Sequence, residues 1–266
     1  MLIVQISDTH ITAPNKKAYG IAATSDNLIR CIEHINQLKP KPDVVLVTGD
    51  VTNANQPDEF IQAKKLLDQL QFPYYVIPGN HDGRSQLSTT FGNEHCPSSA
   101  PFINYVIDDY PIHLIAVDSV IEGKEGGELC DTRLSWLDKK LAEDTNKPTV
   151  VFMHHPPVKV GVFETDVDGF IGANKLGKVI KKYSNIKRII SGHVHLQTHT
   201  LWNGTVVTTA PSVSMELVLD LTLENPSQFA LEPPSYLIHF MSADKEIVTH
   251  SVTVREIDGP HPFEHV

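Results

Sequence analysis

Five short apolar runs in the sequence have the composition of buried strands, and each one ends in a cluster of Asp, Asn or His. The runs are residues 2–7, 43–48, 74–78, 149–153 and 186–191. Loops at the carboxyl ends of strands form the ligand crevice of an open α/β sheet, so we expect the polar residues after these runs to meet at one edge. The candidates are Asp8, His10, Asp50, Asn80, His154, His193 and His195. Seven oxygen and nitrogen donors are too many for one tetrahedral metal ion, and they suit two.

Helical patterns separate these runs. Amphipathic stretches at residues 24–38, 57–70, 132–142 and 174–183 each place an apolar stripe on one helical face. Further strands are expected at residues 113–119 and 205–212, and a hairpin at 236–254. The chain thus begins as βαβαβ and becomes richer in strands, which favours an α/β fold with two packed sheets and helices outside. We expect one domain that spans residues 1–266.

Three stretches are less regular, namely residues 83–101, 119–131 and 211–235. The last contains the apolar segment MELVLDLTL and follows the last strand that carries site residues. It is therefore expected near the rim of the site. A cap over the site, a contact between subunits and an ordinary edge strand all remain open for it.

The charge of the chain limits the classes of partner that it is expected to bind. The formal net charge is −10, which argues against a nucleic-acid polymer or an anionic membrane surface as the main partner. Small anionic substrates stay possible, because two bound divalent metals would reverse the sign locally. The cysteines are Cys31, Cys96 and Cys130, without a CxxC pair, and neither a signal peptide nor a membrane span is evident. We therefore expect a cytoplasmic protein.

The motifs differ in how strongly they indicate chemistry. Asp8 and His10 lie two residues apart past a strand and can face one ion, although such a pair often occurs by chance. The carboxylate of Asp50 could bridge two ions, with helix capping as the alternative. In Gly79-Asn80-His81-Asp82, the Asn can offer a neutral oxygen ligand, and Asp82 could orient or charge the imidazole of His81.

The histidine motifs complete the pattern. His193 and His195 lie on one face of an extended segment, and His154 precedes a stiff Pro156-Pro157 pair. Only one of the adjacent His154 and His155 is expected to bind metal, and His155 is assigned to packing or support. His199 and His239 are assigned structural roles.

In this order, Asp8-x-His10, Gly49-Asp50-x-x-Asn53, Gly79-Asn80-His81-Asp82, His154 and Gly192-His193-x-His195 resemble the calcineurin-like metallophosphoesterase superfamily. The MHHPP segment at 153–157 and the compact length resemble class III cyclic nucleotide phosphodiesterases and bacterial binuclear glycerophosphodiesterases. Asn53 stands where Ser/Thr protein phosphatases have Asp and purple acid phosphatases have Tyr. Asp82 stands where the Ser/Thr phosphatases usually have Glu, so both branches are disfavoured.

The resemblance implies a four-layer α-β-β-α sandwich of two mixed sheets, and oligomers formed through the segment matching 211–235. It also implies roles for each motif residue. One metal would be held by Asp8, His10, Asp50 and His195, and the other by Asp50, Asn80, His154 and His193. Asp50 would bridge them, His81 would assist the leaving oxygen, and Asn80, His81 and His195 would contact substrate.

The expected reaction is hydrolysis of a small phosphodiester by water that the metals activate. The first expectation for the substrate is a 3′,5′-cyclic nucleotide, and the alternative is a glycerophosphodiester. A non-catalytic scaffold is disfavoured because all the matched ligands are retained. The mixed His and carboxylate set suits Mn, Fe, Co or Zn.

Two further residues near the motifs, Arg84 and Asn53, are candidates for supporting roles. Arg84 could contact a phosphate group, or it could be a surface residue with an acidic partner. Asn53 is expected to hold the loop around Asp50.

Overall fold

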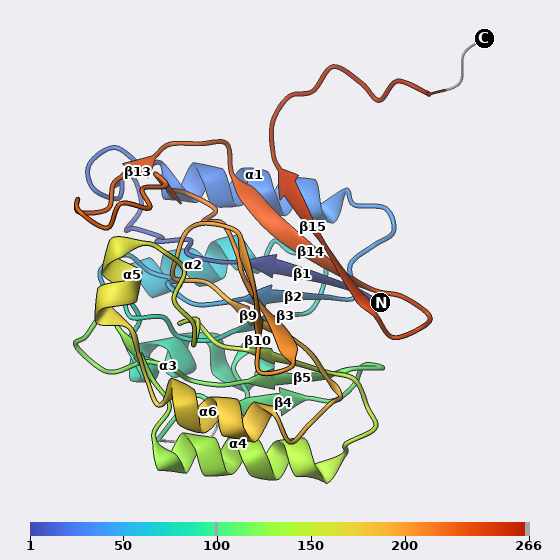
Figure 1. Cartoon of the computed structure of the whole chain (residues 1–266). Helices are drawn as coiled ribbons and strands as arrows, with labels where there is room; N and C mark the ends of the chain where they lie inside the picture. The colour runs from blue at the N-terminus through green and yellow to red at the C-terminus, as the bar shows by residue number, and fades with distance from the viewer. Residues whose placement is uncertain (99–100, 264–266) are drawn as a thin grey trace.

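The computed structural model describes residues 1–98 and 101–263, and it has two large mixed sheets (Figure 1). The first has the strand order β15-β14-β1-β2-β3. Its strands are β15 (Ile247–Thr253), β14 (Ser235–Met241), β1 (Leu2–Ile6), β2 (Val44–Val47) and β3 (Tyr74–Val76). β1, β2 and β3 are parallel, whereas β14 runs antiparallel to β1. The expected hairpin at 236–254 is therefore confirmed as β14 and β15.

The second sheet has the order β10-β11-β9-β7-β5-β4. Its strands are β10 (Thr198–Trp202), β11 (Thr205–Thr209), β9 (Ile186–Ser191), β7 (Thr149–Phe152), β5 (His113–Ala116) and β4 (Tyr105–Ile107). The inner strands are parallel, and β10 and β4 are antiparallel edges.

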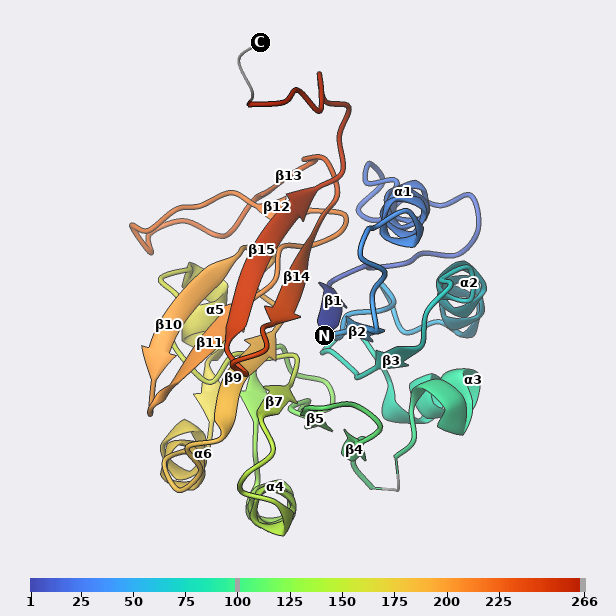
Figure 2. The same ribbon diagram turned by 90° about the vertical axis from the view of Figure 1, so that its right-hand side faces the viewer.

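The helices cover the outer faces of the two sheets (Figure 2). α1 (Thr24–Asn36), α2 (Pro57–Leu67) and α3 (Arg84–His95) lie on the first sheet's side, and α4 (Asp131–Glu143) and α6 (Ala173–Ile180) on the other. Buried side chains of α1 and α2 join the core of the first sheet and the inter-sheet space. Those of α4 and α6 pack with β7 and β9 in a second cluster. The four-layer α-β-β-α arrangement is confirmed.

The polar side chain of Gln5 links the two sheets where they meet. Its Nε2 donates to Ser191 O at 3.0 Å and to Thr48 Oγ1 at 2.9 Å. β1, β2 and β9 are thereby held together just before the loops that carry the polar motifs. This contact explains how ligands from two different sheets reach one place.

The structure differs from the sequence expectations in the irregular stretches. α3 lies in the irregular stretch 83–101. Its buried residues are Leu87 and Phe91 alone, so the sequence has no apolar stripe from which this helix could be predicted. α5 (Phe163–Asp168) was also missed, as were the short strands β6 (Gly127–Glu128) and β8 (Phe170–Ile171). Two-residue strands are too short to show a period.

The segment 211–235 is not an edge strand of either large sheet. Its strands β12 (Glu216–Leu217) and β13 (Phe229–Ala230) pair only with each other in the part of the chain that the structure describes. Phe229 packs with Ala18, Ala22 and Met215, and its ring lies 5.4 Å from that of Tyr19. The segment therefore rests on the loop that follows β1. No helix among the described residues is long and apolar enough to cross a membrane.

Candidate metal centre

The loops after β1, β2 and β9 hold their polar residues in unusual backbone conformations. Asp8, His10, Asp50, His193 and His195 all have positive φ, between 44° and 70°. Residues other than glycine rarely adopt this region, and such strained positions cluster at functional sites. Five of the eleven non-glycine residues with positive φ in the described part of the chain therefore belong to these loops.

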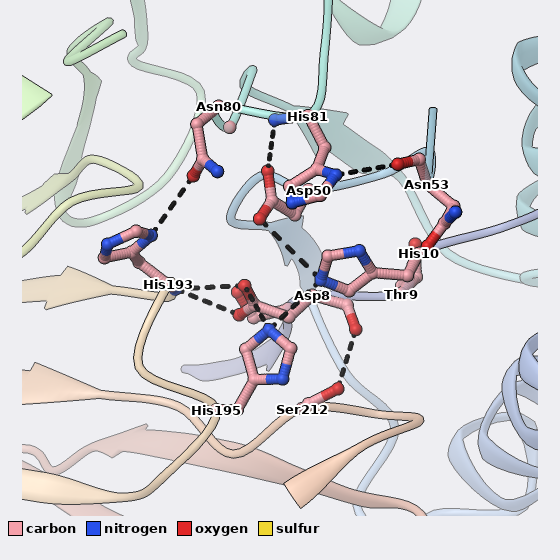
Figure 3. Close-up of polar contacts among 12 residues, drawn as sticks. Asp8, Thr9, His10, Asp50, Asn53, Asn80, His81, His193, His195 and Ser212 are labelled. Carbon is pink, nitrogen blue, oxygen red and sulfur yellow. Dashed lines mark hydrogen bonds and ion pairs between the residues drawn. The ribbon is translucent and has the colours of Figure 1, made fainter. Parts of the chain in front are cut away.

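One donor set comes from Asp8, His10, Asp50 and His195, whose ligand atoms all lie within 4.8 Å of one another (Figure 3). The Nε2 atoms of His10 and His195 are 3.1 Å apart. His195 Nε2 lies 3.4 Å from Asp8 Oδ1, and His10 Nε2 lies 3.7 Å from Asp50 Oδ2. These four residues are the set that the resemblance implies for one metal.

The second donor set shares Asp50 with the first. His154 Nε2 lies 3.4 Å from Asp50 Oδ2 and 3.1 Å from Asn80 Oδ1. His193 Nδ1 lies 3.1 Å from the same Asn80 oxygen. Asp50 Oδ2 is thus within reach of both sets, whereas its Oδ1 accepts the backbone N–H of His81 at 2.9 Å. The geometry is that of a carboxylate between two cation positions.

Backbone carbonyls fix which nitrogen of His154 and of His195 faces the site. His195 Nδ1 lies 2.6 Å from Met215 O, and His154 Nδ1 lies 2.8 Å from Thr48 O. A carbonyl only accepts hydrogen bonds, so each Nδ1 carries a proton and each Nε2 can present a lone pair inward. Lone pairs of nitrogen and oxygen that converge in this way repel one another unless a proton or a metal ion lies between them. The donor set therefore fits two metal ions.

The Asp50 carboxylate and the histidines around it shift one another's pKa. Burial alone would lower the pKa of His154, but the Asp50 carboxylate outweighs it and raises this pKa to about 9. Burial would likewise raise the pKa of Asp50, but the charges of His154, His81 and His10 hold it well below the usual range. Burial lowers the pKa of His10 and His193 to about 3, so these two are neutral, as histidine ligands must be.

Glycines let the loops approach one another closely. A Cβ at Gly79 would lie 2.1 Å from Asp50 Oδ1, and one at Gly192 would lie 2.0 Å from Ser7 Oγ. Any side chain at these positions would displace the bridging carboxylate or the loop after β9. This contact explains the glycine before Asn80 and the glycine before His193.

His155 has both ring nitrogens engaged by the protein. Its Nδ1 lies 2.9 Å from Ser119 Oγ, and its Nε2 lies 2.9 Å from Glu125 O. Burial and the neighbouring His193 hold its pKa well below the usual value. His155 lies close to His154 and His193, but its contacts are those of a support for the loop 119–128.

His81 stands beside the donor sets, and its Nε2 makes no hydrogen bond to the residues that the structure describes. Its Nδ1 lies 2.7 Å from the backbone carbonyl of Asn53, so Nε2 is left for other partners. Its ring meets that of His10 edge to face, with centroids 4.7 Å apart. Asn53 therefore orients His81, in addition to lying in the loop that follows Asp50.

The structure distinguishes between the alternatives for two side chains near the motifs. Asp82 does not orient His81 by a hydrogen bond, because its carboxylate accepts the backbone N–H groups of Val51, Thr52 and Gly79 at 2.9–3.0 Å, but its charge adds to that of Asp50 in raising the pKa of His81. Arg84 is the residue with an acidic partner, because Nε donates to Asp118 at 2.5 Å and Nη2 donates to Val120 O at 2.7 Å. Asp118 lies in the expected strand run 113–119, just after β5 (His113–Ala116), and this run offered no obvious ligand in the sequence.

Sequence reasoning also missed two contacts to the predicted ligands. Asn80 Nδ2 donates to Glu125 at 2.6 Å, and Met215 O accepts from His195. Both partners lie in stretches without a regular pattern, and the Met215 contact is made by the backbone. No signal in the sequence could have identified the latter.

Comparisons with known proteins agree with this geometry. A family model described as calcineurin-like phosphoesterase matches residues 1–197. The chain belongs to the calcineurin-like phosphoesterase family. It is similar to a probable glycerophosphodiester phosphodiesterase GpdQ of Arcobacter nitrofigilis, with 40% identity over 99% of this chain and 97% of the relative. The 3′,5′-cyclic adenosine monophosphate phosphodiesterase CpdA of Escherichia coli K12 is 26% identical over 80% of this chain and 76% of its own.

A solved structure shares the fold of this calcineurin-like phosphoesterase. A dimetal phosphatase from Danio rerio matches with a TM-score of 0.66 and 14% identity, over 96% of this chain and 99% of that one. The relatives and the donor sets together identify the chain as a phosphodiesterase of the metallophosphoesterase family. Its class is that of metal-dependent phosphoric diester hydrolases.

Proposed function

We propose that this enzyme hydrolyses a glycerophosphodiester to glycerol phosphate and an alcohol. The observation that carries the proposal is the pair of donor sets that share Asp50, with the free Nε2 of His81 beside them. The substrate class follows from the relatives named GpdQ, which are 40% and 30% identical over 99% and 100% of this chain. Those matches include the segment 211–235.

The sequence alone placed a cyclic nucleotide first, and the relatives favour the opposite order. The relatives named as cyclic nucleotide phosphodiesterases from Rhodopseudomonas palustris, Nostoc and Escherichia coli are 26–28% identical over 73–98% of this chain. Their identity is lower than the 40% of the GpdQ relative, so they support the common site more than the common substrate. A 3′,5′-cyclic nucleotide therefore becomes the alternative substrate.

Each residue has a task in this reaction. Asp8, His10, Asp50 and His195 would hold one metal ion, and Asp50, Asn80, His154 and His193 the other. When bound, the two ions neutralise the phosphodiester anion and activate water for in-line attack on phosphorus. Mn, Fe, Co and Zn are the candidates that suit this mixed nitrogen and oxygen set.

A side chain of the protein would protonate the leaving group. The alcohol leaves as a strongly basic alkoxide unless a proton reaches it. His81 is the side chain placed for this step, because its Nδ1 donates to Asn53 O and the Asp50 carboxylate outweighs burial and raises its pKa, so that the imidazolium carries a second proton on Nε2. We also assign substrate contact to Asn80, His81 and His195, since the rings of His81 and His195 lie 4.7 Å and 5.0 Å from that of His10.

We also propose that 211–235 forms a contact between two copies of the enzyme. Leu219, Leu221 and Leu231 expose more than half of their side chains on this segment, with relative exposures of 60%, 64% and 53%. A second copy would remove these leucines from water. Replacing Leu219 and Leu221 by Asp should then shift the mass in light scattering to that of a single chain, and an unchanged mass would exclude this contact.

The three unpaired cysteines support a cytoplasmic location.

A substrate panel tests the proposed reaction. The metal-reconstituted enzyme is assayed for kcat/KM on glycerophosphoethanolamine, glycerophosphocholine, cyclic AMP, cyclic GMP and bis(4-nitrophenyl) phosphate, with 4-nitrophenyl phosphate as the monoester control. We expect a glycerophosphodiester to have the highest value among the natural diesters. A higher value for a cyclic nucleotide would establish the alternative, and a preference for the monoester would exclude both.

A further inference from the structure

Asn80 has its two amide ends in different surroundings. Its Oδ1 lies 3.1 Å from both His154 Nε2 and His193 Nδ1, inside the second donor set. Its Nδ2 donates to Glu125 Oε2 at 2.6 Å (Asn80 is labelled in Figure 3). An ionised carboxylate only accepts hydrogen bonds, so Glu125 requires the NH2 end of the amide to face it. The oxygen end then faces the donor set.

We infer that Glu125 is a positioning residue, which keeps the Asn80 oxygen directed at the second cation position and thereby sets the affinity of that position for metal. The inference rests on the proposed two-metal site and assigns a task to a residue outside the motifs. Glu125 acts through Asn80, because its own contact is with the amide nitrogen and not with the histidines.

The amide needs such a partner because its two ends have nearly the same shape. A rotation of the Asn80 side chain amide by half a turn would place NH2 where the oxygen now lies. An amide NH2 group has no lone pair to offer a metal, and its protons would pair with the lone pairs of the histidines instead. A charge-assisted hydrogen bond from Nδ2 to a carboxylate opposes this rotation more strongly than a bond to water would.

The backbone of Glu125 is held in place independently of its side chain. Its carbonyl oxygen accepts from His155 Nε2 at 2.9 Å, and His155 Nδ1 contacts Ser119 Oγ at 2.9 Å. The chain that follows is pressed against His155, since a Cβ at Gly127 would lie 2.5 Å from His155 Cβ. The carboxylate of Glu125 therefore sits on a supported loop and not on a free one.

The other end of this loop is fixed as well. Arg133, which is almost fully buried, donates through Nη1 to Asp118 O at 3.1 Å and Val120 O at 2.9 Å. Arg84 donates to the side chain of Asp118, which is fully buried. Two arginines thus anchor the start of the loop 119–128, and His155 anchors the part that carries Glu125.

Metal binding by the apo-protein tests the inference without any use of activity. Calorimetric titration with Mn²⁺ would compare wild type with Glu125→Ala, Glu125→Gln and Asn80→Ala. The control is Glu122→Gln, because Glu122 is an exposed acid of the same loop that pairs with Arg84 and not with Asn80. We expect Glu125→Ala to bind the first ion as wild type does and the second about 10–100-fold more weakly.

Two comparisons separate positioning from a general effect of charge. The side chain oxygen of Gln can still accept from Asn80 Nδ2, so Glu125→Gln should recover most of the lost affinity. In the background of Asn80→Ala, the further change Glu125→Ala should cost nothing more. Wild-type affinity for the second ion in Glu125→Ala would overturn the inference, and so would an equal loss in the Asn80→Ala background.

The proposed function and this inference fail in different ways. If wild type itself binds fewer than two ions, the proposed two-metal site is wrong, and the inference falls with it. If wild type binds two ions and hydrolyses diesters but Glu125→Ala binds them equally well, only the role of Glu125 is wrong. Circular dichroism of each variant confirms that the fold is intact before titration.

Discussion

The Nδ1 atom of His195 lies 2.6 Å from the carbonyl oxygen of Met215, and this contact joins a ligand of the first donor set to the segment 211–235. A histidine ligand is oriented by the partner of its other nitrogen. Here that partner is a backbone group at the start of the segment that carries β12 and β13. The segment 211–235 therefore orients a residue of the first donor set, in addition to lying at the rim of the candidate site.

Ser212→Ala should weaken metal binding at the first donor set. Ser212 Oγ donates to Asp8 O at 2.8 Å and accepts from the backbone N–H of Met215 at 3.0 Å, so it fixes the carbonyl that orients His195. We expect a loss of about 10–100-fold in metal affinity, measured by titration of the apo-protein. Thr222→Ala, in the exposed part of the same segment, serves as the control. Equal affinities in both variants would show that Ser212 has no such role.

His81→Ala should slow hydrolysis in a manner that depends on the leaving group. For an alkyl diester, loss of the proton donor should lower kcat by about 10²–10⁴-fold. For a nitrophenyl diester the loss should be much smaller, because nitrophenolate leaves readily without a proton. Rates with both substrates measure this ratio. The same loss on both substrates would exclude the leaving-group role.

Arg84→Met should lower stability and leave substrate affinity unchanged. The Arg84 guanidinium is bound to Asp118, which is fully buried, and loss of one partner of a buried ion pair typically costs about 3–5 kcal/mol. Urea unfolding measures this cost, and KM measures substrate affinity. A rise in KM with unchanged stability would restore the role in phosphate binding that the sequence left open.

His239→Gln should reduce the dependence of stability on pH. His239 is buried between Gln5 and Thr249, with contacts of 2.9 Å to each, and burial followed by the charges of Arg188 and His199 lowers its pKa to about 3. The unfolded chain binds a proton at His239 near pH 6.5 and the folded chain does not. Stability from this group is complete above pH 6.5 and is lost as pH falls towards 3.

The effect is large enough to measure. At one unit below pH 6.5, protonation of His239 in the unfolded chain lowers the free energy of unfolding by roughly 1.4 kcal/mol relative to neutral pH. Thermal unfolding of wild type and His239→Gln between pH 5 and 8 gives the two slopes. The unfolding temperature of His239→Gln should be lower than that of wild type at every pH. Between pH 8 and pH 5, however, it should fall by less than that of wild type. Identical slopes would show that His239 titrates normally in the folded protein.

The sequence predicted the parts of the fold that have strong periodicity. The helix expected at 132–142 is observed as α4 (Asp131–Glu143), and the run at 186–191 is observed as β9 (Ile186–Ser191). The polar residues after the apolar runs meet at one edge because β1, β2, β3, β7 and β9 end there. The strand pattern predicted that these residues come together, and the family resemblance supplied their division into two donor sets.

The remaining features depend on tertiary contacts. Two arginines bind Asp118, and the resulting loop brings Glu125 to Asn80, although these residues are far apart in the sequence. The edge strand β10 was missed because its residues alternate between partly and fully exposed, which leaves no apolar run to detect. Such features follow from packing that no local pattern encodes.

The most direct test of the central claim is the number of metal ions bound per chain in wild type, Asp50→Ala and Asn80→Ala after reconstitution with Mn²⁺. Because Asp50 Oδ2 lies between both donor sets, the account predicts two ions for wild type, one for Asn80→Ala and fewer than one for Asp50→Ala. Elemental analysis of the desalted proteins gives these numbers. Two ions retained by Asp50→Ala would contradict the assignment of a shared carboxylate.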